Sequence, residues 1–232
     1  PSEDSMDRSL EALANETLRM ALKCDTPEEA IQIVLKFTCK SLNGVRSYVF
    51  ERDERGIDQI VYRYEVAGEK PVTNLVADAP DFSYKWRQSF EEHGVLIGED
   101  VEDLRETDPE QYAALQSIDI TSMYMVPLVD KGEVFGFYGV DNPSGGTLDR
   151  VISILHMMAD CIQANIKRRD LDLSLQQEEA ERAVAKRERQ IGKVLSGAHM
   201  GVWSMVIGDG EPRFYPDDHV AFLVGSKPGD TP

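Results

Sequence analysis

The chain has 232 residues, 41% of them hydrophobic and 29% charged, which is typical of a folded globular protein and excludes a disordered one. Its formal net charge of −17 repels nucleic-acid phosphates and anionic lipids, so neither nucleic acid nor a membrane is expected as a partner. The three cysteines form no CxxC or Cys/His cluster, and no run reaches the roughly 20 apolar residues of a membrane span. We therefore expect no metal site and no spanning helix.

Residues 1–26 predict a separate amphipathic helix, because leucines recur there at helical spacing. Its apolar stripe consists of Leu10, Leu13, Leu18 and Leu22. The first four residues are acidic overall and show no signal-peptide pattern, which favours a cytoplasmic location.

A second helix is predicted to begin at Pro27. Thr26 can cap its first turn, and Glu29 three residues later completes a capping box. Gly44 predicts its end.

Two β-hairpins are predicted from runs of apolar and β-branched residues around polar turns. Their strands lie at 46–52 with 59–66 and at 122–128 with 133–141. Between the hairpins the sequence predicts helices at 82–92 and 108–117 and a short strand at 95–101. The last strand contains Gly136 and Gly139, which suggest a close approach of another backbone. We expect an α+β fold with an antiparallel sheet of five or six strands, flanked by helices.

Residues 148–195 predict one continuous helix of about 70 Å, at ~1.5 Å per residue. Its apolar residues follow an imperfect heptad pattern, which Arg169 and Gln176 interrupt. We expect its early part to pack on the N-terminal helix. Because the later part has nothing of its own chain to cover it, we expect a parallel homodimer through residues 152–183. The expected interface residues are Ile152, Leu155, Ile162, Ile166 and Leu173.

Residues 198–232 predict a strand, a Gly-Asp-Gly turn, a second strand and a short apolar helix. A segment of this size is too small to bury a core of its own.

No arrangement of catalytic side chains is evident. The four histidines, His93, His156, His199 and His219, lie near no serine or cysteine in a nucleophile–base pattern. The pair Gly145-Gly146 lacks the following lysine of a phosphate loop. We therefore expect that this chain performs no catalysis.

Aromatic and methionine side chains on the strands and on the helix that covers them are candidates for lining a small-molecule pocket. We expect this pocket between the sheet and the crossover segment 67–117. The candidates are Tyr48, Tyr62, Trp86, Met123 and Tyr138. The same residues can equally form ordinary core.

The order of elements over residues 27–166 resembles the GAF domain, a cytoplasmic sensor module. Three stretches are similar to its first strand and turn, its tryptophan-bearing helix with the following strand, and its last hairpin. They are "RSYVFERDERG", "WRQSFEEHGVLIGEDVEDL" and "ITSMYMVPLVDKGEVFGFYGVDNP". The resemblance implies a GAF-like sensor domain at 27–147, followed by a signalling helix at 148–197.

The stretch "AHMGVWSMVIGDGEPRFYPDDHVAFLVG" resembles the opening of a PAS domain, so 198–232 is expected to be a partial PAS-like segment. Such tandems commonly precede a GGDEF diguanylate cyclase or a histidine kinase. Neither a GGDEF sequence nor a kinase nucleotide motif occurs in this chain. The resemblance therefore implies the sensory region of a bacterial signalling protein, regulating a diguanylate cyclase or else a histidine kinase outside this chain.

This sequence departs from several specialised GAF domains. The signature of cyclic-nucleotide-binding members is absent. Cys24 and Cys39 lie at a helix start and within a helix, which disfavours a covalently bound bilin and a GAF-type methionine sulfoxide reductase. The cofactor is left unknown, and a dimerisation scaffold without ligand is a further alternative.

Overall fold

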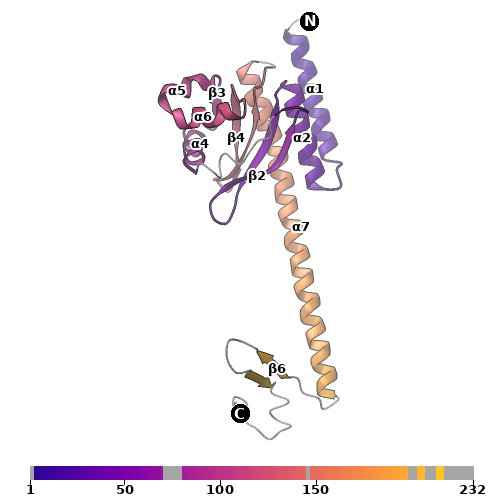
Figure 1. Cartoon of the computed structure of the whole chain (residues 1–232). Coiled ribbons are helices and arrows are strands. Elements are labelled where there is room, and N and C mark those ends of the chain that lie inside the picture. The colour runs from indigo at the N-terminus through magenta and orange to yellow at the C-terminus, as the bar shows by residue number, and fades with distance from the viewer. Residues whose placement is uncertain (1–2, 70–79, 145–146, 198–202, 207–212, 217–232) are drawn as a thin grey trace. The chain divides into compact units, whose positions relative to one another are not determined.

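The computed structural model describes residues 3–69, 80–144, 147–197, 203–206 and 213–216 (Figure 1). The chain forms two compact units, Pro1–Asp170 and Leu171–Pro232. The longest helix, α7 (Leu148–Gly197), has residues in both units.

A five-stranded antiparallel sheet, with strand order β2-β1-β5-β4-β3, forms the centre of the first unit. The strands are β1 (Arg46–Arg52), β2 (Asp58–Glu65), β3 (Leu96–Gly98), β4 (Met123–Asp130) and β5 (Glu133–Asp141). Both predicted hairpins are confirmed, because β1 pairs with β2 and β4 pairs with β5. The predicted α+β fold is confirmed as well.

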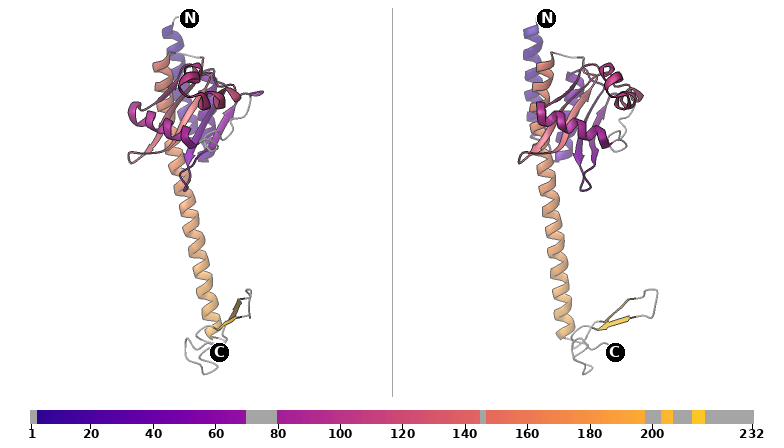
Figure 2. Two further views of the ribbon diagram at one scale, coloured as in Figure 1. Left: turned by 60° about the vertical axis from the view of Figure 1, so that its left-hand side comes forward. Right: turned by 90° about the vertical axis from the view of Figure 1, so that its left-hand side faces the viewer.

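Helices cover both faces of this sheet, as the views in Figure 2 show. On one face lie α1 (Glu3–Ala21), α2 (Pro27–Ser41) and the first part of α7. On the other lie α4 (Pro80–His93), the 3₁₀ turn η1 (Val101–Asp103), α5 (Leu104–Thr107) and α6 (Pro109–Ser117). Each face has its own buried apolar cluster. The N-terminal helix shares its cluster with α7, as predicted.

The start of α2 follows the capping prediction, but its end does not follow the glycine prediction. Thr26 Oγ1 accepts a hydrogen bond from the Glu29 N–H at 3.2 Å. After the helix, Asn43 rather than Gly44 has the left-handed backbone, with φ of 51°. A Cβ at Gly44 would lie 2.5 Å from Val140 Cγ2. This glycine is therefore needed for close packing on β5.

Two glycines in β5 allow the strands on either side to approach closely. A Cβ at Gly136 would lie 2.2 Å from the Phe50 carbonyl oxygen of β1. A Cβ at Gly139 would lie 2.4 Å from Met125 Cγ of β4. The close contacts are made with the adjacent strands.

The early part of α7 is buried within its own chain, which corrects part of the predicted dimer interface. Leu155, Ile162 and Ile166 are at most 2% exposed and belong to the cluster that includes α1 and α2. They cannot also contact a second copy. Ile152 is half-buried, whereas Leu173 is 56% exposed.

The second unit contains the later part of α7 and the antiparallel pair β6 (Trp203–Val206) and β7 (Arg213–Pro216). These match the two predicted strands. The predicted turn and final helix lie outside the described residues. Among the described helices, none combines the length and apolar character needed to cross a bilayer.

Candidate ligand-binding site

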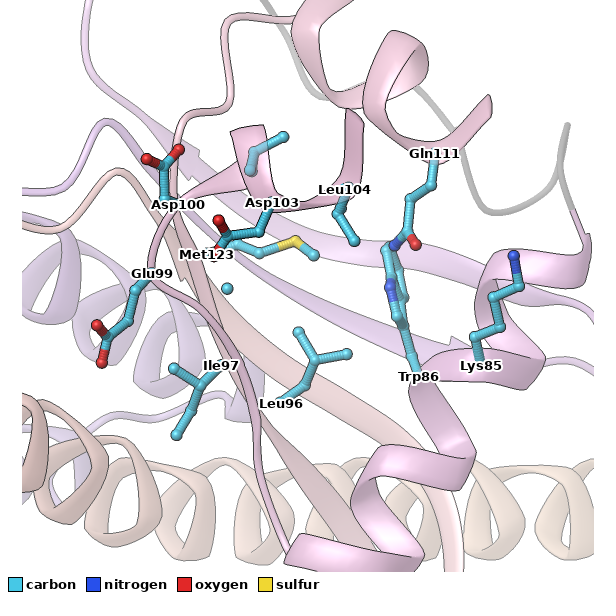
Figure 3. Close-up of a pocket in the computed structure, with 12 residues that line it drawn as sticks. Lys85, Trp86, Leu96, Ile97, Glu99, Asp100, Asp103, Leu104, Gln111 and Met123 are labelled. Atoms are coloured by element: carbon cyan, nitrogen blue, oxygen red, sulfur yellow. The ribbon is translucent and has the colours of Figure 1, made fainter. Parts of the chain in front are cut away.

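A cavity of about 270 Å³ lies on the α4–α6 side of the sheet (Figure 3). Its walls come from α4, from the segment that runs from β3 through η1 to α5, from α6 and from β4. The lining residues are Lys85, Trp86, Leu96, Ile97, Gly98, Glu99, Asp100, Val101, Asp103, Leu104, Gln111 and Met123. This is the region between the sheet and the crossover in which the sequence predicted a pocket.

Helix α4 places Trp86 in the cavity wall. Trp86 and Phe90, one turn apart, are both buried and pack against Phe137 of β5, with ring centroids 5.7 Å apart in each case. The side-chain amide of Gln111 is oriented with its nitrogen 3.2 Å from Asp108 Oδ2. In this orientation the amide oxygen of Gln111 accepts a hydrogen bond from the indole N–H of Trp86 at 2.8 Å. The tryptophan is therefore fixed by packing and by a buried hydrogen bond.

The polar part of the lining is predominantly acidic. Glu99, Asp100 and Asp103 contribute three exposed carboxylates, and Lys85 contributes the one ammonium group among the lining residues. That ammonium group forms an ion pair with Asp108 and lowers the pKa of the Asp108 carboxyl. Asp100 Oδ1 accepts the Glu102 N–H at 2.9 Å and so caps η1.

A buried polar network lies at the end of β5. Arg46 Nε donates to Asp141 Oδ2 at 3.0 Å, and Tyr48 Oη donates to Asp141 Oδ1 at 2.7 Å. Arg46 also donates to the Ile118 carbonyl at 2.9 Å. Burial raises the pKa of Asp141 to about 6, although Arg46 and Tyr48 both favour the carboxylate. This network joins the end of α6 to the strand that leads to α7.

Asn142 makes a second connection between the crossover and the strand before α7. Its Oδ1 accepts the N–H groups of Thr121 and Ser122 at 2.8 and 3.1 Å, and its Nδ2 donates to the Asp119 carbonyl at 2.8 Å. The Thr121 carbonyl accepts the N–H of Val101, a cavity residue, at 2.8 Å. A short series of hydrogen bonds thus runs from the cavity wall to the β5–α7 connection.

The structure separates the five predicted pocket residues. Trp86 and Met123 line the cavity, and Tyr48 belongs to the apolar cluster on the same face. Tyr62 and Tyr138 belong to the cluster on the opposite face, and the Tyr138 hydroxyl contacts the Thr38 hydroxyl of α2. The prediction that all five gather on one face is therefore wrong.

Most of the cavity wall was absent from the predicted residues. Leu96, Ile97 and Val101 belong to the segment "VLIGEDV", which was predicted only as a strand and a loop. The signal available in the sequence was the run of apolar residues followed directly by carboxylates. Gln111 gave no such signal.

No cysteine lines the cavity. Cys39 is buried in α2, where its thiol donates to the Gly44 carbonyl at 3.0 Å. Cys24 and Cys161 are half-buried and pack against the α1, α2 and α7 cluster. Burial raises the pKa of all three thiols, that of Cys39 to about 11. Within the described residues no group of histidine, cysteine and carboxylate side chains could hold a metal ion.

No protein-family model and no curated protein matches this sequence. Solved structures do resemble it. The far-red absorbing dark state of JSC1_58120g3 with bound biliverdin aligns with a TM-score of 0.56 at 13% identity, covering 68% of this chain and 99% of that one. GAF3 of Slr1393 from Synechocystis aligns with a TM-score of 0.54 at 16% identity, covering 65% and 99%.

The chromophore-binding domain of the R. palustris bacteriophytochrome RpBphP3 aligns with a TM-score of 0.59 at 12% identity. The alignment covers 72% of this chain and 62% of that one. At such identities the likeness concerns the fold alone. The sheet order, the helices on its two faces and these alignments show that the first unit has a GAF-type fold.

Proposed function

We propose that this chain is the sensory and regulatory part of a signalling protein and that a small molecule binds in the cavity beside Trp86. The cavity itself carries the proposal, because it combines a buried apolar wall with a few polar groups at its edge. At about 270 Å³ it lies just below the roughly 300–1,000 Å³ range of ligand pockets. A metabolite-sized ligand fits this volume.

The proposed ligand differs from the bilin that some structural neighbours bind. Biliverdin is a long tetrapyrrole with two propionate groups. The cavity is small, its polar lining is mainly acidic, and no cysteine lies in its wall. We therefore propose a non-covalent ligand of another class.

The bound ligand would act on α7 through the hydrogen bonds at Thr121 and Asn142. A shift of η1 around a ligand would move Thr121, which is bonded to Val101 on one side and to Asn142 on the other. Asn142 directly follows β5, and α7 begins six residues later. Two sets of contacts at this point would give the two-state element that signalling requires.

We further propose that α7 pairs with a second copy of the chain through residues 173–194, C-terminal to the residues buried in the first unit. Leu173, Ala180, Val184, Ile191 and Val194 follow alternating heptad spacings there, and all are exposed. A diguanylate cyclase, or alternatively a histidine kinase, is the proposed output, because both need two subunits side by side.

Catalysis by this chain is not part of the proposal. A GAF-type reductase would need a reactive thiolate at the ligand pocket, whereas the three thiols have raised pKa values and none lies in the cavity wall.

A metabolite library screened by thermal shift tests the sensor proposal. A ligand at 100 times its Kd should stabilise the protein by about 2.7 kcal/mol. Ile97→Trp, which fills the cavity edge, should abolish the shift. Val129→Trp is the matched control, because Val129 is a β-strand residue of nearly equal exposure, 39% against 40%, outside the cavity. If no compound stabilises the chain, or if both variants respond alike, the cavity is not a ligand site.

A further inference from the structure

We propose that the ligand of this cavity is a small organic cation, an amine or guanidinium group on a short apolar body. This inference rests on the proposed function and specifies its ligand class. The structure supports it through the distribution of apolar and charged groups around the cavity (Figure 3).

The inner wall suits the apolar body of such a ligand. Trp86, Leu96 and Met123 are each less than a tenth exposed and all line the cavity, and Leu104 adds a half-buried side chain. The indole N–H of Trp86 is already bonded to Gln111. This part of the wall therefore offers apolar contact and little hydrogen bonding.

The outer wall suits a positive charge. Glu99, Asp100 and Asp103 line the cavity on the side away from Lys85 (Figure 3). In the described part of the chain, the carboxylates of Glu99 and Asp103 form no hydrogen bond or ion pair, whereas the Asp100 carboxylate accepts the Glu102 N–H. These groups attract a cation and repel an anion, and the net charge of −17 acts in the same direction.

The single lysine in the wall does not reverse this preference. Its ammonium group is bound by Asp108, so its charge is largely balanced before any ligand arrives. An anionic ligand would have to compete with Asp108 for Lys85 and also lie close to three carboxylates. A neutral ligand would leave the carboxylates of Glu99 and Asp103 without a charged partner among the described residues.

A bare metal ion fits this site less well than an organic cation. Among the described residues, the carboxylates form no group that could coordinate one ion together. They lie along one edge of an apolar hollow instead. A ligand that joins an apolar body to a charged end matches both parts.

Three probes with one phenyl frame test the charge preference on the whole 232-residue chain. They are 2-phenylethylamine, 2-phenylethanol and 3-phenylpropionate, which are a cation, a neutral molecule and an anion. Isothermal titration calorimetry should show the amine binding at least about tenfold more tightly than either other probe. Added salt should weaken the binding of the amine, because it screens the attraction between its charge and the carboxylates.

Charge-neutralising variants locate the effect. Glu99→Gln with Asp103→Asn should weaken amine binding about tenfold. Glu106→Gln with Glu110→Gln removes the same charge from exposed positions outside the cavity lining and should change it less than about twofold.

Two results would overturn the inference. The first is that the alcohol or the carboxylate binds as tightly as the amine and that Ile97→Trp abolishes this binding. The cavity would then still be a ligand site, and only the charge class would be wrong. The other is no binding by any of the three probes at millimolar concentration. The sensor proposal would then depend on the library screen alone.

Discussion

Asp108 connects α4 and α6 through one carboxylate. Its Oδ1 accepts the Gln111 N–H at 3.3 Å and caps α6. Its Oδ2 accepts from the Lys85 ammonium of α4 and lies 3.2 Å from the Gln111 amide nitrogen that faces it. The charge pair and the helix cap are separable, because asparagine caps a helix about as well as aspartate.

Asp108→Asn is therefore expected to lower the free energy of unfolding at neutral pH by about 0.5–1 kcal/mol, since Lys85 is half exposed. The hydrogen bond from Lys85 lowers the folded-state pKa of Asp108 below its unfolded value. Its stabilisation is thus present above the unfolded pKa and disappears as the pH falls through the folded one. The difference between the two proteins should therefore shrink as the pH falls below about 3.9, the usual pKa of an aspartate in an unfolded chain, as measured by urea denaturation. An equal difference at every pH would attribute the loss to hydrogen bonding alone.

At the scale of elements, α7 is fixed to the sheet shortly before the end of the first unit. Arg169 donates to both oxygens of Glu51 of β1, at 2.7 and 2.8 Å, and to the Tyr62 hydroxyl of β2 at 3.1 Å. The guanidinium also lies 5.9 Å from the Tyr62 ring centroid. An arginine that interrupts the heptad pattern thus holds the helix against its own sheet.

Arg169→Gln is expected to lower the stability of the first unit by about 1.5–3 kcal/mol, because the ion pair is mostly buried and made of charged hydrogen bonds. Arg169→Lys should recover only part of this stability, since lysine cannot bind both oxygens in the same plane.

A Trp203→Phe background leaves Trp86 as the one tryptophan, so fluorescence during urea denaturation reports on the first unit. The control Arg189→Gln, at an exposed position of α7, should change stability by less than about 0.5 kcal/mol. Equal effects of Arg169→Gln and Arg189→Gln would show that the Glu51 contact contributes nothing.

The elements could be predicted from the sequence, whereas the faces of the strands could not. Turn residues and helix caps are local, so both hairpins and the start of α2 were correct. The face of a tyrosine depends on strand register. Val49 lies opposite both Tyr62 and Tyr138, which places these two tyrosines on its face and Tyr48 on the other. Because β1 is buried on both faces from Ser47 to Phe50, its sequence has no alternation that reveals this register.

The same limit applied to α7 and to the cavity. An apolar stripe on a helix shows that a partner exists but does not say which one. For Leu155, Ile162 and Ile166 the partner is the chain's own core. The cavity wall comes from segments distant in sequence, α4, the β3–η1 segment and α6, so only Trp86 and Met123 were recognised beforehand.

At the scale of the whole molecule, the part of α7 in the second unit has an apolar stripe that is exposed in the described part of the chain. Leu173, Val184, Ile191 and Val194 are 56%, 58%, 52% and 70% exposed. Together with Ala180 they are spaced as the a and d positions of a coiled coil. Gln177 and Arg187 occupy two further positions of this stripe. A second copy of the same helix is the partner that this self-complementary pattern fits, and the polar positions predict a weak dimer.

Val184→Asp combined with Ile191→Asp is expected to convert this dimer to a monomer, because it places two charges in the centre of the seam. Sedimentation at tens of micromolar should show one species of 26.0 kDa. Arg182→Gln with Arg189→Gln is the matched control: it changes the net charge by the same amount at exposed positions on the opposite side of the helix. The control should remain dimeric.

Neither double variant replaces a residue of the first unit, so both should keep the stability of that unit, unlike a substitution at the buried Ile166. A parent chain that sediments as a monomer, or a dimer that survives the aspartates, would place any subunit contact elsewhere than on residues 173–194.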